Sequence, residues 1–265
     1  MKARYPHIIL TLGRSGSNTL VDLLNQNAEI LNYGEVLGPW NQIRRVRYLI
    51  SGGSGSEERY VDRLLRSTTV AAAANLTRTA NKIRHRAFDD IKQMGHLRTI
   101  GFKEFSLNIL KMGLAEHLLS QPDIRFIGLT RSNPLERLVS TLRLGETREV
   151  LSRESGGARS VSLTIDAPEL VPQLDIMQRE VDDLEDLLAQ VPSERKYVLD
   201  YSEFYSSPEV TIGHMRNIYD FLGVTPSTPR VRMTKIIQRP MAEVISNYDE
   251  CRRATAGTRF ERYFA

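Results

Sequence analysis

The sequence has one cysteine, one tryptophan and no long hydrophobic run. A single cysteine, Cys251, cannot form a disulfide within the chain, and no cysteine–histidine spacing is typical of a zinc site. No apolar run approaches the roughly 18 residues of a membrane span, and the apolar stretch before Gly13 is too short for a secretory signal. These absences predict a cytoplasmic protein without a transmembrane segment and without a metal site.

The residues that are present have the composition of a globular protein. Hydrophobic residues make up 41% and charged residues 26% of the 265 residues, which excludes a disordered or collagen-like chain. The length suits one large domain or two small ones. Either arrangement can bury a sizeable core.

The formal net charge of +4 hides two oppositely charged segments. Residues 44–98 contain twelve Lys and Arg against five acids, a surplus of +7, whereas residues 166–186 contain eight acids and one Arg, which gives −7. Two interpretations remain open. Both segments are solvated helix faces, or the basic segment meets an anionic ligand.

Five short segments rich in β-branched and aromatic residues alternate with helix-like stretches. Continuously apolar strands of this kind are typical of a parallel sheet with helices on both faces, because each crossover helix must bury one side against the sheet. We therefore predict an α/β fold with a central, mostly parallel five-stranded sheet. The five segments are 7–12, 30–35, 99–104, 125–130 and 196–201.

We expect one domain, 1–265, with a helical insertion at 41–98. More than sixty residues separate the second and third predicted strands, far more than one crossover helix needs. The insertion is the candidate lid or acceptor-binding region. Its apolar stretch 70–74 is either an interface for a homodimer or one side of a buried helix.

The strongest local signal lies between the first predicted strand and the following helix. Two glycines allow a tight turn and a close approach to a ligand, and three short polar residues open the helix, whose first amides bind anions. The alternative is a plain Gly-Ser turn. The Lys-Ser/Thr pair of a Walker loop is missing, which disfavours an ordinary ATPase or kinase. The residues are Gly13, Gly16, Ser17, Asn18 and Thr19.

This loop resembles the 5′-phosphosulfate loop of sulfotransferases that use 3′-phosphoadenosine 5′-phosphosulfate (PAPS). Further segments are similar to motifs of that family and follow in the same order, closest to the bacterial and carbohydrate-directed members. They are Gly101-Phe102-Lys103, the strand ending in Arg131 with Ser140 on the next helix, Tyr197 to Glu203, Phe221 to Val224, and the C-terminal stretch beginning at Met233-Thr234-Lys235. The resemblance implies a three-layer, P-loop-like fold.

The resemblance also implies which residues bind PAPS. Arg131 and Ser140 would hold the 3′-phosphate, with Arg137 and Arg143 as helpers, and Tyr201 would flank the adenine. Lys235 is a further candidate contact of the nucleotide phosphates. The residues implied for the phosphosulfate end are Arg14, Ser15, Gly16, Ser17, Asn18 and Thr19.

Three residues are the candidate catalytic groups. Arg14 stands where the family has its catalytic Lys or Arg, and its permanently charged guanidinium suits an electrostatic clamp on the leaving phosphate. Glu35 is the candidate general base, with Glu104 in reserve. Lys103 would orient the sulfate or the glutamate.

The predicted function is transfer of a sulfuryl group from PAPS to a hydroxyl of a carbohydrate or glycolipid, with no metal required. The alternatives are a P-loop nucleotide kinase and a non-catalytic nucleotide-binding protein. Nucleic acid is not an expected partner, because the basic stretch lacks the interleaved aromatic residues of stacking platforms.

Overall fold

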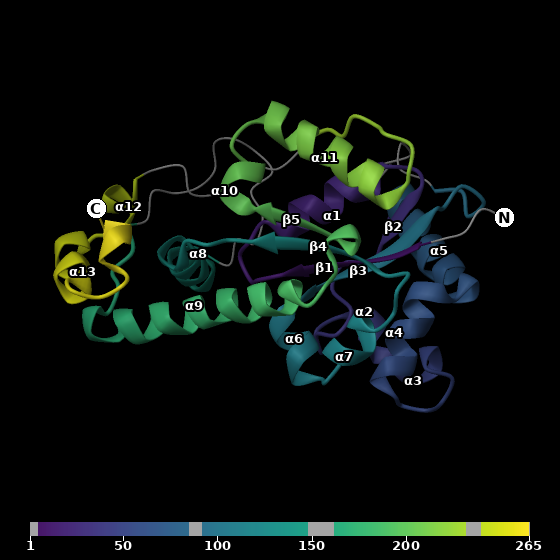
Figure 1. Ribbon diagram of the computed structural model, residues 1–265, viewed down its shortest axis with the longest axis horizontal. Helices are drawn as coiled ribbons and strands as arrows, with labels where there is room; N and C mark the ends of the chain where they lie inside the picture. The colour runs from purple at the N-terminus through teal and green to yellow at the C-terminus, as the bar shows by residue number, and fades with distance from the viewer. Residues whose placement is uncertain (1–4, 85–91, 148–161, 232–239, 265) are drawn as a thin grey trace.

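The chain folds around a five-stranded sheet in which every pair of neighbouring strands is parallel (Figure 1). The computed structural model describes residues 5–84, 92–147, 162–231 and 240–264. The sheet has the order β2-β3-β1-β4-β5, which confirms the predicted α/β class. Its strands are β1 (Tyr5–Thr11), β2 (Ile30–Asn32), β3 (Thr99–Phe105), β4 (Arg125–Thr130) and β5 (Lys196–Asp200).

β2 ends three residues earlier than the sequence predicts. Gly34 has a φ of +72°, and its amide donates to the Asn32 side chain at 2.9 Å, so the chain turns at this point. Residues 33–34 still run alongside β3, because the Tyr33 amide donates to Gly101 O and the Lys103 amide donates to Gly34 O, each at 2.9 Å. The turn carries Glu35 past the end of the strand.

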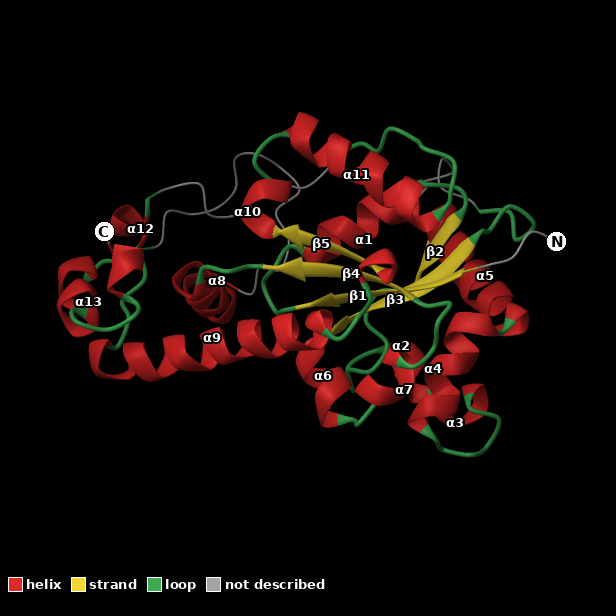
Figure 2. Ribbon diagram, in the orientation of Figure 1, coloured by secondary structure: helices red, strands yellow, loops and turns green. Residues whose placement is uncertain are grey.

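Helices cover both faces of the sheet (Figure 2). Alternate residues of β1 enter different cores: Ile8 and Leu10 lie in one hydrophobic cluster, and Ile9 lies in another. Figure 1 shows the three layers that result. One side has α1 (Ser17–Gln26), α10 (Tyr201–Phe204) and α11 (Pro208–Leu222), and the other has α4 (Glu57–Arg66), α6 (Ser106–Lys111), α7 (Ala115–Leu119) and the end of α9 (Ala167–Ala189).

The segment between β2 and β3 contains four helices among its described residues. It contains α2 (Gln42–Arg45), α3 (Arg47–Ile50), α4 and α5 (Thr68–Arg84). Ser56 caps α4 by accepting a hydrogen bond from the Arg59 amide at 3.2 Å, and Tyr60 and Leu64 pack into the core beside β1. In the stretch 70–74, Ala71 is buried against β3, while Ala72 and Ala73 are exposed.

A third hydrophobic cluster lies beyond the end of the sheet toward which the strands run (Figure 2). It is built from α8 (Pro134–Thr147), the first half of α9, α12 (Met241–Val244) and α13 (Tyr248–Thr255). A parallel bridge between Leu163 and Ile245 joins the chain before α9 to the chain before α13. Short 3₁₀ turns at Ser193–Arg195 and Glu261–Phe264 complete the described elements.

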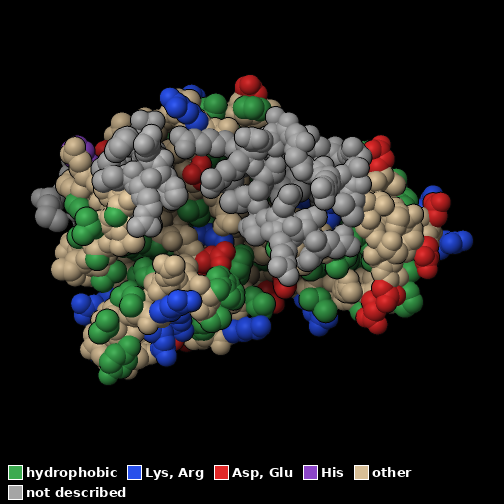
Figure 3. All heavy atoms as spheres, turned by 180° about the vertical axis from the view of Figure 1, so that it is seen from behind, with side chains coloured by type: hydrophobic (Ala, Val, Ile, Leu, Met, Phe, Trp, Pro, Cys, Tyr) green, Lys and Arg blue, Asp and Glu red, His purple; other side chains and the backbone are tan. Residues whose placement is uncertain are grey.

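The charged side chains of the segments 44–98 and 166–186 lie in different environments. Several cations of the basic segment are paired or buried: Arg66 pairs with Asp123 at 2.7 Å, and the buried Lys92 amine donates to two backbone carbonyls. The acids at 182, 183, 185 and 186 are exposed on α9. Seen from behind, basic and apolar side chains gather at the corner formed by α3 and α4 (Figure 3).

Among the described residues, no helix combines the length and the apolar character that crossing a bilayer requires.

Candidate active site

The candidate site lies where the strand connections diverge. From β1 the chain crosses toward β2 on one side of the sheet, and from β4 it crosses toward β5 on the other. Ligands of open parallel sheets bind in the crevice at such a switch point. Arg14 follows β1 and Arg131 follows β4, so the topology brings these two arginines together.

Three predicted donor-site residues are in direct contact. The Arg14 Nε donates to Ser140 Oγ at 3.0 Å, and Arg131 donates to the carbonyl oxygen of Arg14 at 2.7 Å. The sequence separates Arg14 from Arg131 and Ser140 by more than a hundred positions. The β1 loop, the end of β4 and α8 bring them to one point.

The loop between β1 and α1 is a tight turn. Arg14 has a φ of +62°, a left-handed conformation that costs a residue with a Cβ on the order of 1–2 kcal/mol. The Ser15 hydroxyl bonds to Leu12 O at 2.8 Å and to Thr11 Oγ1 at 2.5 Å. The Ser15 side chain therefore closes the loop from within, and Ser15 can offer a ligand only its backbone amide.

Gly16 lies beneath two tyrosines at the start of α1. A Cβ on Gly16 would lie 2.7 Å from Tyr205 Cε2 and 3.0 Å from Tyr201 Cε2, and the Tyr205 hydroxyl donates to Gly16 O at 2.8 Å. Ser17 and Thr19 are buried, whereas Asn18 is exposed. The Thr19 amide donates to Gly16 O at 2.9 Å, whereas the amides of Ser17 and Asn18 come before the first acceptor that the helix offers, so this end attracts anions.

The arginines leave positive charge unbalanced at this point. None of the ion pairs among the described residues involves Arg14, and burial together with the charge of Arg131 lowers the pKa of Arg14. Arg131 pairs with Glu136 at 2.7 Å, yet its buried Nε has no hydrogen-bond partner among the described residues. Two cations with one carboxylate and an unused donor are suited to an anionic ligand.

Tyr201 stacks against Arg131, whose guanidinium carbon lies 4.1 Å from the ring centroid. Burial raises the pKa of the Tyr201 phenol, so the ring stays neutral. Arg137 does not face the same space: it is fully buried and donates to Gly13 O, Met177 O and Glu180. Arg137 supports the loop from below. Lys235 lies outside the described residues.

The Glu35 carboxylate is held on both of its oxygens. Lys103 Nζ contacts Oε1, and Trp40 Nε1 donates to Oε2 at 2.9 Å. The Lys103 side chain is 2% exposed and that of Glu35 is 20% exposed. A buried ammonium and an indole N–H thus fix a carboxylate that solvent still reaches, which is the arrangement a general base needs.

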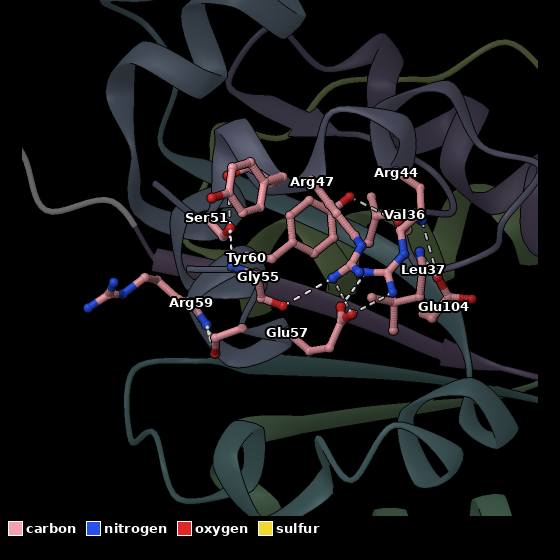
Figure 4. A network of polar contacts seen from close by, with 12 residues as sticks. Val36, Leu37, Arg44, Arg47, Ser51, Gly55, Glu57, Arg59, Tyr60 and Glu104 are labelled. Carbon is pink, nitrogen blue, oxygen red and sulfur yellow. Dashed lines mark hydrogen bonds and ion pairs between the residues drawn. The ribbon is translucent and has the colours of Figure 1, made fainter. Parts of the chain in front are cut away.

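Glu104 does not suit the reserve role that the sequence suggested. It is fully buried, and its Oε2 accepts the amides of Val36 and Leu37 at 3.1 and 2.8 Å (Figure 4). Its Oε1 accepts the Phe105 amide and the Asn108 side chain. Side chains alternate along β3, so Glu104 points away from the side where Lys103 meets Glu35. It anchors the chain that follows Glu35.

Sequence reasoning missed Trp40, Tyr205 and Glu136. The signal for Trp40 was present, because it is the only tryptophan and follows Glu35 by five residues. Its contact with Glu35 depends on a turn that the sequence pattern does not specify. Within the described residues, no group of three or more His, Cys, Asp and Glu side chains could hold a metal ion.

Comparisons with known proteins identify a family for this sequence. The family model described as "Sulfotransferase family" matches residues 6–228. A sulfotransferase from Alicyclobacillus acidocaldarius is 19% identical over 99% of this chain and 96% of its own, with a TM-score of 0.46. The sulfotransferase STF1 from Mycobacterium tuberculosis is 17% identical over 96% of this chain and 71% of its own, with a TM-score of 0.38. Among curated proteins, no sequence matches significantly.

Proposed function

Because the chain belongs to the sulfotransferase family, we propose that it transfers a sulfuryl group from PAPS to a hydroxyl group of a carbohydrate or glycolipid. The observation that carries the proposal is the pairing of two sites at one sheet edge. One is the cationic loop around Arg14, and the other is the carboxylate of Glu35 between Lys103 and Trp40. The family and the first site favour sulfuryl transfer over phosphoryl transfer.

The donor fits the residues around Arg14. The unpartnered Arg131 Nε, the Arg14 guanidinium and the first amides of α1 supply fixed positive charge without a metal ion. We assign Arg14, Ser17, Asn18 and Thr19 to the phosphosulfate end, with the amides of Ser15 and Gly16, and we assign Arg131, Ser140 and the ring of Tyr201 to the nucleotide end. Lys235 keeps its proposed contact with the nucleotide phosphates.

Glu35 acts on the acceptor. When bound, PAPS supplies the activated sulfuryl group and departs as adenosine 3′,5′-bisphosphate. Glu35 takes the proton of the acceptor hydroxyl on Oε2, which keeps one lone pair beside the Trp40 hydrogen bond. Lys103 holds Oε1 and fixes the plane of the carboxylate. Arg14 stabilises negative charge on the departing phosphate oxygens.

Thermal unfolding tests the donor assignment. A ligand at 100 times its dissociation constant adds about 2.7 kcal/mol to the free energy of unfolding, which for a chain of this size raises Tm by roughly 5–10 °C. We expect adenosine 3′,5′-bisphosphate to produce this shift at a concentration where AMP and ATP produce little. Arg131→Gln should remove most of the difference between the bisphosphate and AMP. An equal shift with AMP would rule out a donor with a 3′-phosphate.

A further inference from the structure

The only tryptophan of the chain combines a hydrogen bond to the candidate base with an exposed ring. Its indole N–H donates to the candidate base Glu35 at 2.9 Å, while 61% of the residue remains exposed. An exposed large aromatic side chain beside a reactive group offers a flat apolar surface to a ligand. Figure 4 shows Val36 and Leu37, which lie between Glu35 and Trp40 in the sequence, beside Glu104 and Tyr60.

We propose that Trp40 is the acceptor platform. In this role it orients Glu35 through its N–H and binds the ring of an acceptor sugar on its exposed indole surface. The inference rests on the proposed function and narrows its acceptor to a hydroxyl carried directly on a saturated sugar ring.

The Trp40 indole packs against the backbone at Gly38. A Cβ on Gly38 would overlap the indole, so only glycine allows the ring to pack this closely on the backbone. The Asn41 side chain donates to the carbonyl oxygen of Glu35 and accepts the Ile43 amide at 3.1 Å. The turn from 35 to 41 is therefore closed on itself, and the platform and the base belong to one rigid loop.

This loop is clamped to the insertion and to β3. The Tyr60 hydroxyl donates to Val36 O at 3.0 Å, and Glu104 accepts the amides of Val36 and Leu37 (Figure 4). Arg44 reaches Glu57 with both terminal nitrogens, and Arg47 joins the same carboxylate at 3.0 Å. A bidentate arginine–carboxylate pair adds geometric precision as well as energy. These contacts fix the backbone between Glu35 and Trp40, and the hydrogen bond from the indole N–H holds the ring beside Glu35.

The short distance from Trp40 to Glu35 identifies the acceptor class. A ring that lies on the indole places its edge within one hydrogen bond of Oε2, so a hydroxyl attached to that ring reaches the base. A hydroxyl on a flexible chain gains no such alignment. The surroundings are polar, because Glu35 accepts the indole N–H and is itself contacted by Lys103 and by the Asn41 side chain. A sugar ring suits both requirements, because it has an apolar face and a polar rim.

Tryptophan fluorescence tests the platform directly, since all indole emission of this chain comes from Trp40. The protein is first saturated with adenosine 3′,5′-bisphosphate and then titrated with a panel of methyl glycosides, with sorbitol as the open-chain polyol of matched size. We expect at least one glycoside to change the emission saturably and to protect it from acrylamide quenching, while sorbitol does neither. Equal responses to ring and chain, or no response to the panel, would overturn the inference.

Three variants separate positioning from binding, assayed with labelled PAPS on the sugar that the panel identifies. Trp40→Phe keeps a ring but loses the N–H, so we expect kcat to fall about tenfold with little change in the acceptor KM. Trp40→Leu should also raise the acceptor KM, by roughly five- to tenfold. Tyr5→Leu is the control, because Tyr5 is also an exposed aromatic residue, at 41%, and begins β1 at the end of the sheet opposite Glu35.

The two proposals fail in different ways. If the bisphosphate shifts Tm but Trp40→Leu leaves kcat and KM unchanged, the platform is wrong and the donor assignment stands. If the bisphosphate has no effect, the proposed function is wrong whatever the fluorescence shows. Because Trp40 is exposed, its variants should keep the Tm of the parent chain, so a loss of activity cannot be mistaken for unfolding.

Discussion

Glu35 and Glu104 lie on either side of Lys103 in this site, and their environments are opposite. Glu35 is partly exposed and accepts hydrogen bonds from two side chains, Lys103 and Trp40. Glu104 is fully buried and accepts four hydrogen bonds, three of them from backbone amides. One carboxylate can therefore exchange a proton with an acceptor, and the other can only hold the backbone in place.

Matched substitutions should separate these two roles. Glu35→Gln removes the proton acceptor, so we expect turnover to fall by about 10²–10⁴-fold with the bisphosphate-induced Tm shift unchanged. Glu104→Gln turns an amide NH₂ toward backbone donors, which should lower the free energy of unfolding by about 1–3 kcal/mol. Turnover assays and urea unfolding measure the two effects. A loss of bisphosphate binding in Glu35→Gln would make Glu35 a structural residue.

Three elements meet at Arg137, which α8 carries. The buried guanidinium donates to Gly13 O at 3.3 Å in the loop after β1, and to Met177 O at 2.8 Å and Glu180 at 2.5 Å in α9. A buried arginine that satisfies groups from two other elements fixes their relative position. Glu180 is one of the acids of the segment 166–186, and its ion pair with Arg137 gives it a structural role. The exposed acids of that segment at 182, 183, 185 and 186 form a solvated helix face.

Removing this junction should destabilise the fold. Arg137→Met leaves two carbonyls and a partly buried carboxylate without a donor, so we expect the free energy of unfolding to fall by roughly 2–3 kcal/mol. Glu180→Gln should cost about 1 kcal/mol, and the double variant should cost less than the sum, because the two residues interact. Urea unfolding of the three variants measures the coupling. Strictly additive losses would contradict a direct interaction.

Sequence patterns predicted the elements better than the contacts between them. Four of the five strands were predicted within two residues of their observed bounds, because short apolar runs alternating with helices are typical of an α/β fold, whereas β2 is half as long as predicted. The turn between β1 and α1 was also predicted, and contact with Glu35 was one of the two roles that the resemblance left open for Lys103. The third core was not, since the contacts of α8 and α9 with α12 and α13 connect segments far apart in sequence. Nor was Trp40, whose position depends on the turn at Gly38.

Across the whole sheet, one buried histidine links three strands to the site. The Asn32 amide donates to His7 Nε2 at 2.9 Å, so His7 Nδ1 carries the proton and donates to Thr99 Oγ1 at 2.8 Å. Thr99 in turn donates to Tyr5 O at 2.6 Å, and Asn32 Oδ1 accepts the Gly34 amide next to Glu35. This network of hydrogen bonds requires a neutral His7, because a protonated His7 Nε2 could not accept the Asn32 amide.

The stability of the molecule should therefore fall in mild acid. Burial lowers the pKa of His7 to about 3, whereas the ordinary value in an unfolded chain is 6.5. Between these values the unfolded state holds a proton that the folded state does not, so the free energy of unfolding falls by about 1.4 kcal/mol for each pH unit below 6.5. Above pH 6.5 the histidine is neutral in both states and the effect is absent.

His7→Gln provides the comparison, because glutamine can accept from Asn32 and donate to Thr99 but does not titrate. The variant is expected to lose some packing energy at every pH. Its difference from the parent chain should shrink by about 2 kcal/mol between pH 7.5 and pH 5.0, measured by urea unfolding. Contributions common to the two chains cancel in this difference. Parallel stability curves over this range would mean that His7 gains its proton without opening the sheet, and that its hydrogen-bond chain rearranges around the charge.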